Sequence, residues 1–96
     1  MSLRDAYFAR MASQFRRWDA EMAMLIEKAA RMDDISRARF TRQLQPMRSH
    51  RDAAYRRLQQ IRTASETSWR SLQIGVDAGW IAMQHALALA QRQGRS

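Results

Sequence analysis

The chain has 96 residues, of which three are glycine and one is proline, and its formal net charge is +8. This length allows one small domain, 1–96, and the scarcity of glycine and proline favours an all-helical one. The absence of cysteine excludes disulfide frameworks and thiolate metal sites. The first ten residues carry Arg4, Asp5 and Arg10 and lack the apolar core of a signal peptide, so a bacterial cytoplasmic protein is the default expectation.

The first segment, 3–32, shows the heptad repeat of a coiled coil. Its apolar residues are spaced alternately by three and four positions: Phe8, Met11, Phe15, Trp18, Met22, Leu25, Ala29 and Met32. This pattern predicts a helix that supercoils with a neighbouring helix. The next heptad positions, Ser36, Arg39 and Gln43, are polar, so the seam ends near Met32.

Three positions carry signals that break or restart a helix. Asp33-Asp34 can cap a second helix, and Thr63-Ala-Ser-Glu66 matches a capping box with Thr63 as the cap. Breaks at 33–34 and 63–65 predict three helices of similar length. A single break near Pro46 would instead give two arms of equal length. We expect long antiparallel helices that form either a coiled-coil hairpin or a three-helix bundle.

The middle segment, 35–62, is rich in arginine. Residues 37–62 hold eight arginines and one acid, Asp52. The arginines lie on all sides of the predicted helix except its apolar seam, which favours a solvated or charge-paired coiled-coil helix. The alternative is an anion- or nucleic-acid-binding segment, and its candidate residues lie to one side of the seam: Arg37, Arg48, Arg51 and Arg62. No zinc-finger, RNA-binding or basic-zipper motif supports that alternative.

The last segment, 64–92, combines tryptophan with glycine. Met47, Leu58, Trp69 and Trp80 are eleven residues apart, a period that keeps a seam nearly straight. On a helical wheel, one face of the segment holds Trp69, Leu72, Val76, Trp80, Met83 and Leu87. Beside it runs a strip of small residues, Gly75, Gly79, Ala86 and Ala90. Such a strip lets another helix backbone approach closely.

This last helix is apolar on most of its sides, which predicts a homo-oligomer. Asp77 is its single charge between Ser71 and Gln91, and Ile74 and Ile81 lie off the main face. A helix of this kind needs neighbours on most sides, more than one small chain can supply. The predicted interface consists of Phe8, Met11, Phe15, Trp18, Met22, Leu25, Trp69, Leu72, Gly75, Val76, Gly79, Trp80, Met83 and Leu87.

Several motifs resemble those of a known group of proteins. The pattern Trp69-x-x-Leu72-x-x-Gly75-Val76-x-x-x-Trp80-x-x-Met83, preceded by Ala64-Ser65, resembles the C-terminal part of a family of small bacterial coiled-coil proteins. These proteins, including cyanobacterial members, are often described as stress-response proteins. Ala6-Tyr7, Trp18-Asp19-Ala20-Glu21 and Arg51-Asp52-Ala53-Ala54 resemble the same family. The resemblance implies a helical, non-enzymatic protein and supplies no catalytic residues.

No other pattern predicts a reaction, a metal site or a cofactor. Most of the seven methionines occupy seam positions, where methionine is an ordinary core residue and not a copper ligand. His50 and His85 are 35 residues apart without a second ligand at metal spacing, and His50 is predicted to be an interface histidine on the seam. We therefore expect a self-associating interaction or scaffold protein. Possible further partners are an acidic protein or a nucleic acid.

A membrane role is the least favoured alternative. Residues 69–90 are long enough to span a bilayer, but Gln73, Asp77, Gln84 and His85 would lie inside the span. An aspartate near the centre of a bilayer costs about 2.5–3.5 kcal/mol. Peripheral association through 69–90 is therefore the form that a membrane role would take, and a membrane partner is not expected.

Overall fold

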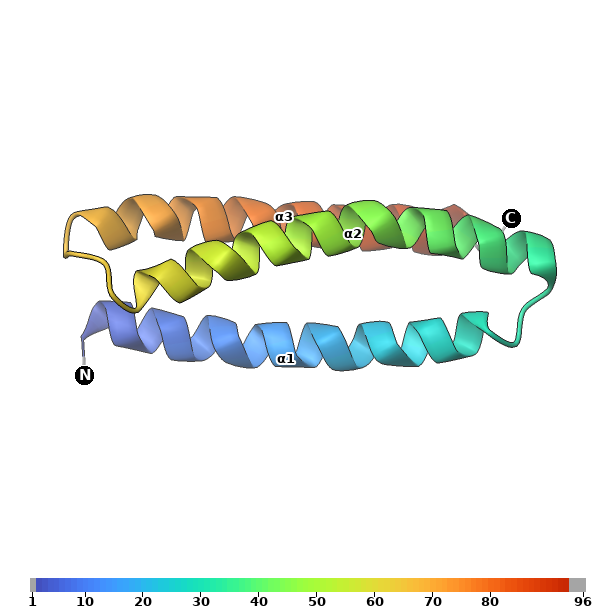
Figure 1. Ribbon diagram of the computed structural model, residues 1–96, viewed down its shortest axis with the longest axis horizontal. Coiled ribbons are helices and arrows are strands. Elements are labelled where there is room, and N and C mark those ends of the chain that lie inside the picture. The colour runs from blue at the N-terminus through green and yellow to red at the C-terminus, as the bar shows by residue number, and fades with distance from the viewer. Residues whose placement is uncertain (1, 94–96) are drawn as a thin grey trace.

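The computed structural model describes residues 2–93, which form three long α-helices joined by two short turns (Figure 1). These are α1 (Leu3–Ala29), α2 (Asp34–Ile61) and α3 (Ser68–Gln93), of 27, 28 and 26 residues. They run up, down and up along a body about 50 × 18 × 17 Å in extent. The described residues contain no strand. The all-α prediction is confirmed, in its three-helix form.

The turn between α1 and α2 forms as the sequence predicts. Asp33 is the N-cap of α2, and its Oδ1 accepts a hydrogen bond of 2.8 Å from the Ser36 N–H. Its Oδ2 accepts a second one, of 3.1 Å, from the Ser36 hydroxyl. These bonds lower the pKa of the Asp33 carboxyl, because they stabilise its charged form. A carboxylate at this position also interacts favourably with the helix dipole.

The predicted capping box at the second turn is wrong. Thr63 lies in the turn that directly follows α2, and its N–H donates to the Gln60 carbonyl at 3.4 Å. The next helix therefore starts later, at Ser68. There the Ser65 hydroxyl accepts a hydrogen bond of 3.2 Å from the Ser68 N–H. Ser65 performs the capping role that the sequence assigned to Thr63 and Glu66.

The alternative of a hairpin that turns at Pro46 is also wrong, because α2 continues through this residue. A proline inside a helix costs about 3 kcal/mol, since it removes a backbone donor and crowds the preceding turn. The exposed Pro46 ring lies away from the core, while Leu44 and Met47 on either side are buried. Burial of these large apolar side chains offsets the penalty.

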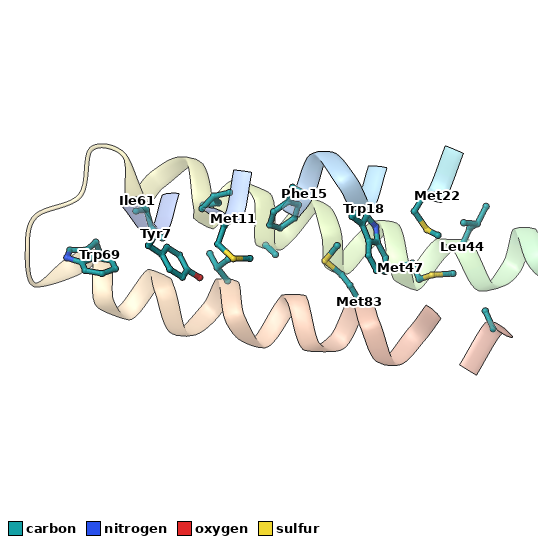
Figure 2. Close-up of a cluster of buried hydrophobic side chains, with 14 residues drawn as sticks. Tyr7, Met11, Phe15, Trp18, Met22, Leu44, Met47, Ile61, Trp69 and Met83 are labelled. Carbon is teal, nitrogen blue, oxygen red and sulfur yellow. The ribbon is translucent and has the colours of Figure 1, made fainter. Parts of the chain in front are cut away.

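The two predicted seams meet in one core along the axis of the bundle (Figure 2). The buried apolar residues are Tyr7, Met11, Phe15, Trp18, Met22, Ala29, Leu44, Met47, Ala54, Leu58, Ile61, Trp69, Val76, Met83 and Ala90. Aromatic rings fill its central layer. Phe15 makes edge-to-face contacts of 5.5 Å between ring centroids with both Tyr55 and Trp80, and Trp18 contacts Trp80 at 5.7 Å. Such arrangements are the favoured geometry for aromatic pairs.

Three seam predictions fail at points where the helices stop or come very close. Met32 is exposed because α1 ends at Ala29, so the heptad register no longer applies there. The second seam continues through Leu58 and Ile61 to Ser65 by spacings of three and four, and Ser65 is exposed because α2 ends at Ile61. His50 is exposed because its own backbone occupies the interface: its carbonyl oxygen lies 3.7 Å from the place where a Cβ on Gly79 would be. No room is left there for an imidazole.

Candidate interaction surfaces

The structure brings the 14 predicted interface residues together, but inside one chain. Half of them are buried between the helices: Met11, Phe15, Trp18, Met22, Trp69, Val76 and Met83. The other half are partly buried against the same core: Phe8, Leu25, Leu72, Gly75, Gly79, Trp80 and Leu87. The residues predicted to meet a second copy therefore already have neighbours within the chain. Any surface for a partner must consist of other residues.

The small-residue strip on α3 receives α2. A Cβ added at Gly79 would lie 2.7 Å from the Cβ of Ala54, which is fully buried on α2. One turn earlier, a Cβ on Gly75 would lie 2.7 Å from the Cδ of Arg57. The close backbone approach predicted from the glycines is thus present, between α2 and α3 of the same chain. The small residues of the strip predict that a backbone comes close, but they do not predict which helix it belongs to.

Arg51, a candidate for anion binding, is held in contacts between α1 and α2. Its Nε and Nη2 donate hydrogen bonds of 3.1 and 2.7 Å to the two carboxylate oxygens of Asp19 on α1. Asp52 accepts a third one, of 3.3 Å. The guanidinium carbon also lies 4.5 Å from the ring centroid of Tyr55. The hydrogen bonds to Asp19, more than any other contact, raise the pKa of Arg51.

The other three candidates for anion binding are not gathered into a site. Arg37 forms an ion pair with Asp34 in the first turn of α2. Arg62 lies over the ring of Phe8, with its guanidinium carbon 5.4 Å from the centroid. Arg48 is exposed, beside a surface hollow that Asp19 and Asp52 also line. The predicted cluster of four cations is therefore broken up by carboxylates and a ring.

A hydrogen bond that the sequence analysis missed joins α1 to α3. The Tyr7 hydroxyl donates to Asp77 Oδ1 at 2.6 Å. The ring of Tyr7 is buried, and this burial together with the neighbouring carboxylate raises the pKa of Tyr7. The single charge between Ser71 and Gln91 thus has a definite structural partner. Because the two residues are 70 positions apart, no local pattern reveals the pair.

The face of α3 opposite the core is apolar and exposed. Its large side chains are Ile74, Ile81 and Leu89, which are 72%, 61% and 54% exposed. Ala78 and His85, also exposed, lie between them on the same side of the helix. We call Ile74, Ala78, Ile81, His85 and Leu89 the outer row of α3. The sequence analysis noted these isoleucines, and the structure shows that no other helix of residues 2–93 covers them.

A second apolar feature lies at the end where α1 connects to α2, the right end in Figure 1. Here a cavity of about 330 Å³ opens between all three helices. We call it the turn-end cavity, and its lining consists of Leu25, Lys28, Met32, Ser36, Arg39, Phe40, Gln43, Leu87, Ala90 and Gln91. Apolar side chains from each helix form its walls, and no carboxylate is among the lining residues.

Other kinds of site find no support in the part of the chain that the structure describes. His50 and His85 line one shallow groove between α2 and α3, but residues 2–93 contain no group of three His, Asp or Glu side chains that could hold a metal ion. In the same range, no helix combines the length and apolarity needed to cross a membrane. Comparisons of the chain with protein-family models, with curated proteins and with solved structures found no match.

Proposed function

We propose that this chain is a non-enzymatic helical interaction protein that self-associates through the outer row of α3. The observation that supports this proposal is the exposure of Ile74, Ile81 and Leu89 on the side of α3 opposite the core. Scattered apolar residues are normal on a protein surface, but a continuous row along one helix is typical of an interaction site.

The spacing of the outer row fits a second copy of the same helix. Ile74, Ala78, Ile81 and His85 follow one another by four, three and four positions, the spacing of a coiled-coil seam. Two such helices related by a twofold axis would present the same row to each other. The contact would bury no free charge, because Asp77 faces α1 and accepts the Tyr7 hydrogen bond.

Electrostatics distinguish this interaction from anion binding. Each copy carries a formal net charge of +8, so two copies repel one another. Salt screens this repulsion, with a Debye length of about 8 Å at 0.15 M, and should therefore strengthen self-association. Binding of a nucleic acid or an acidic protein would weaken with added salt.

Molecular mass measured by light scattering tests the proposal across protein and salt concentrations. We expect the wild type to associate at micromolar concentrations, more tightly at higher salt. The double variant Ile74→Glu/Ile81→Glu should remain monomeric. A matched control is Leu3→Glu/Ile35→Glu, since these side chains are 72% and 74% exposed and lie outside the outer row. A wild type that stays monomeric at high micromolar concentration and high salt would contradict the proposal. An equal loss of self-association in the Leu3→Glu/Ile35→Glu control would contradict it as well.

A second candidate function is binding of nucleic acid or another polyanion. The arginines that support it are not the four candidates predicted from the sequence. Arg39, Arg42 and Arg56 are exposed on α2 and form no ion pair within residues 2–93. A gel-shift titration with duplex DNA at several salt concentrations tests this function. Tight binding at 0.15 M salt that weakens steeply with added salt would favour it over self-association.

The biological setting is also a proposal. The resemblance to small bacterial coiled-coil stress-response proteins supports a role for this self-association in a stress response in the bacterial cytoplasm. Protein levels measured before and after heat, osmotic and oxidative stress test it, and we expect a rise under at least one of these conditions.

A further inference from the structure

The turn-end cavity is a place where the core of the bundle is incompletely filled. The central layer contains Phe15, Trp18 and Trp80 in mutual contact. The last large buried side chains before the turn are Met22 on α1 and Leu44 on α2, and the buried residues Ala29 and Ala90 are small. Leu25, Phe40 and Leu87 are only partly buried and line the cavity instead of closing it.

The charge at the cavity is one-sided. Lys28 from α1 and Arg39 from α2 are exposed residues of its lining. Neither of them forms an ion pair with another residue in the range 2–93. Since no carboxylate of residues 2–93 lines the cavity, a ligand with an apolar body and an anionic head would meet both an apolar wall and the positive charges of Lys28 and Arg39 there.

We propose that the turn-end cavity binds a free anionic amphiphile, a single acyl chain with a carboxylate head. The chain lies against Leu25, Phe40 and Leu87, and the head remains at the solvent-exposed rim that carries Lys28 and Arg39. A volume of about 330 Å³ is at the lower end of the usual range for ligand pockets, so one chain of medium length fits and a two-chain lipid does not.

This inference does not depend on the proposed self-association. Ile74, Ile81 and Leu89 of the outer row are absent from the cavity lining, so either proposal can fail without the other. A variant such as Ile74→Glu/Ile81→Glu should bind the amphiphile as the wild type does. Loss of association in that variant would then test the outer row alone.

Isothermal titration calorimetry with decanoate below its micellar concentration tests the proposal on the full chain. We expect saturable binding of one decanoate per chain. Decanol and decyltrimethylammonium share the chain but lack the anionic head, and we expect them to bind at least about tenfold more weakly. Equal binding of all three compounds would overturn the assignment of the head group to Lys28 and Arg39.

Matched charge variants locate the head group. Lys28→Gln/Arg39→Gln should weaken decanoate binding by about tenfold, since a charge-assisted contact is lost at the rim. Arg16→Gln/Arg42→Gln lowers the net charge equally at exposed positions outside the cavity and should change affinity less than about twofold. The same loss in both variants would show attraction by net charge only and would overturn the proposal.

Methyl NMR locates the acyl chain. The Met32 methyl resonance should shift on titration, because Met32 lines the cavity, whereas that of Met11, buried near the far end of the core, should not. The site is absent if decanoate does not saturate or if the Met11 methyl shifts equally. Binding to anionic phosphatidylglycerol vesicles without binding to monomeric decanoate would show a membrane-surface partner in place of a free ligand.

Discussion

The contact between α2 and α3 differs in kind from the contacts that hold α1. The α2 and α3 backbones lie close together because Gly79 leaves space that Ala54 fills. Helix α1 keeps a greater distance and is held by large rings, such as Phe15, and by polar contacts at specific points. The first contact therefore has no room for an added atom at Gly79, while the second depends on a few large groups. Substitutions should separate the two cases.

The largest effect should come from the ring that anchors α1. Phe15→Ala removes a fully buried side chain in contact with Tyr55 and Trp80, and we expect a loss of about 3–5 kcal/mol in the free energy of unfolding. Urea unfolding followed by far-UV circular dichroism measures it. Phe40→Ala, at a partly buried position, should cost about 1–2 kcal/mol. Equal losses would show that α1 has no special anchor.

Substitution by alanine should change the free energy of unfolding in opposite directions at Gly75 and Gly79, which lie one helical turn apart. Gly79→Ala places a methyl group 2.7 Å from the Ala54 Cβ, so α2 and α3 must separate, and we expect a net loss of about 1–3 kcal/mol. At Gly75 the nearest atom belongs to the flexible, exposed Arg57 side chain, which can move away. Gly75→Ala should therefore stabilise the protein by up to about 1 kcal/mol through helix propensity. Thermal melts of both variants measure the pair, and stabilisation in both would mean that the backbones are not in close contact.

A smaller effect should come from the hydrogen bond between α1 and α3. Tyr7→Phe removes a donor to the exposed Asp77, which can bind water instead, so we expect a loss of about 1 kcal/mol at neutral pH.

The same pair should give a pH signature. Folding raises the pKa of Tyr7 above the ordinary value of 10.0 for tyrosine, so the unfolded state ionises first as pH increases. Stability due to Tyr7 is complete below pH 10.0 and declines above it. The difference between wild type and Tyr7→Phe should therefore shrink in alkaline solution. A difference in stability that stays constant from about pH 8 to about pH 11 would contradict this expectation.

The smallest effect should follow from changes outside both contacts. Arg42→Glu/Arg56→Glu alters exposed positions of α2 that form no ion pair within residues 2–93, and we expect a change within about 0.5 kcal/mol. Arg51→Gln, which loses the contacts with Asp19 and the Tyr55 ring, should cost more. Equal stability of these two variants would show that the Arg51 contacts contribute nothing.

Much of the fold could be predicted because helical periodicity is a local property. The heptad from Phe8 to Ala29 and the wide spacing of Leu58, Trp69 and Trp80 each identify a core-facing side of a helix. The Asp33 cap was predictable as well, since the residue and the group it binds are three positions apart. These features require no knowledge of which helices are neighbours.

The pairing of helices could not be predicted in the same way. The glycines at 75 and 79 predict that another helix packs closely against α3. The same sequence pattern would be expected whether that helix is α2 of the same chain or a helix of another chain. The contacts Tyr7–Asp77 and Arg51–Asp19 join residues far apart in sequence. The sequence therefore does not reveal that Arg51, a candidate for anion binding, is already paired with a carboxylate. The outer row could be recognised as a surface for a partner only from the structure, in which α2 already occupies the strip at Gly75 and Gly79.

The edge-to-face contact of Trp18 with Trp80 has an optical consequence. The two indoles belong to α1 and α3, with centroids 5.7 Å apart, so both rings are held in fixed orientations and should give tryptophan bands in the near-ultraviolet circular dichroism spectrum. Far-ultraviolet ellipticity mainly reports helix content. A state in which α1 has separated while all helices persist would keep the helical signal and lose the near-ultraviolet bands, so the protein can report its own tertiary contact without an added label.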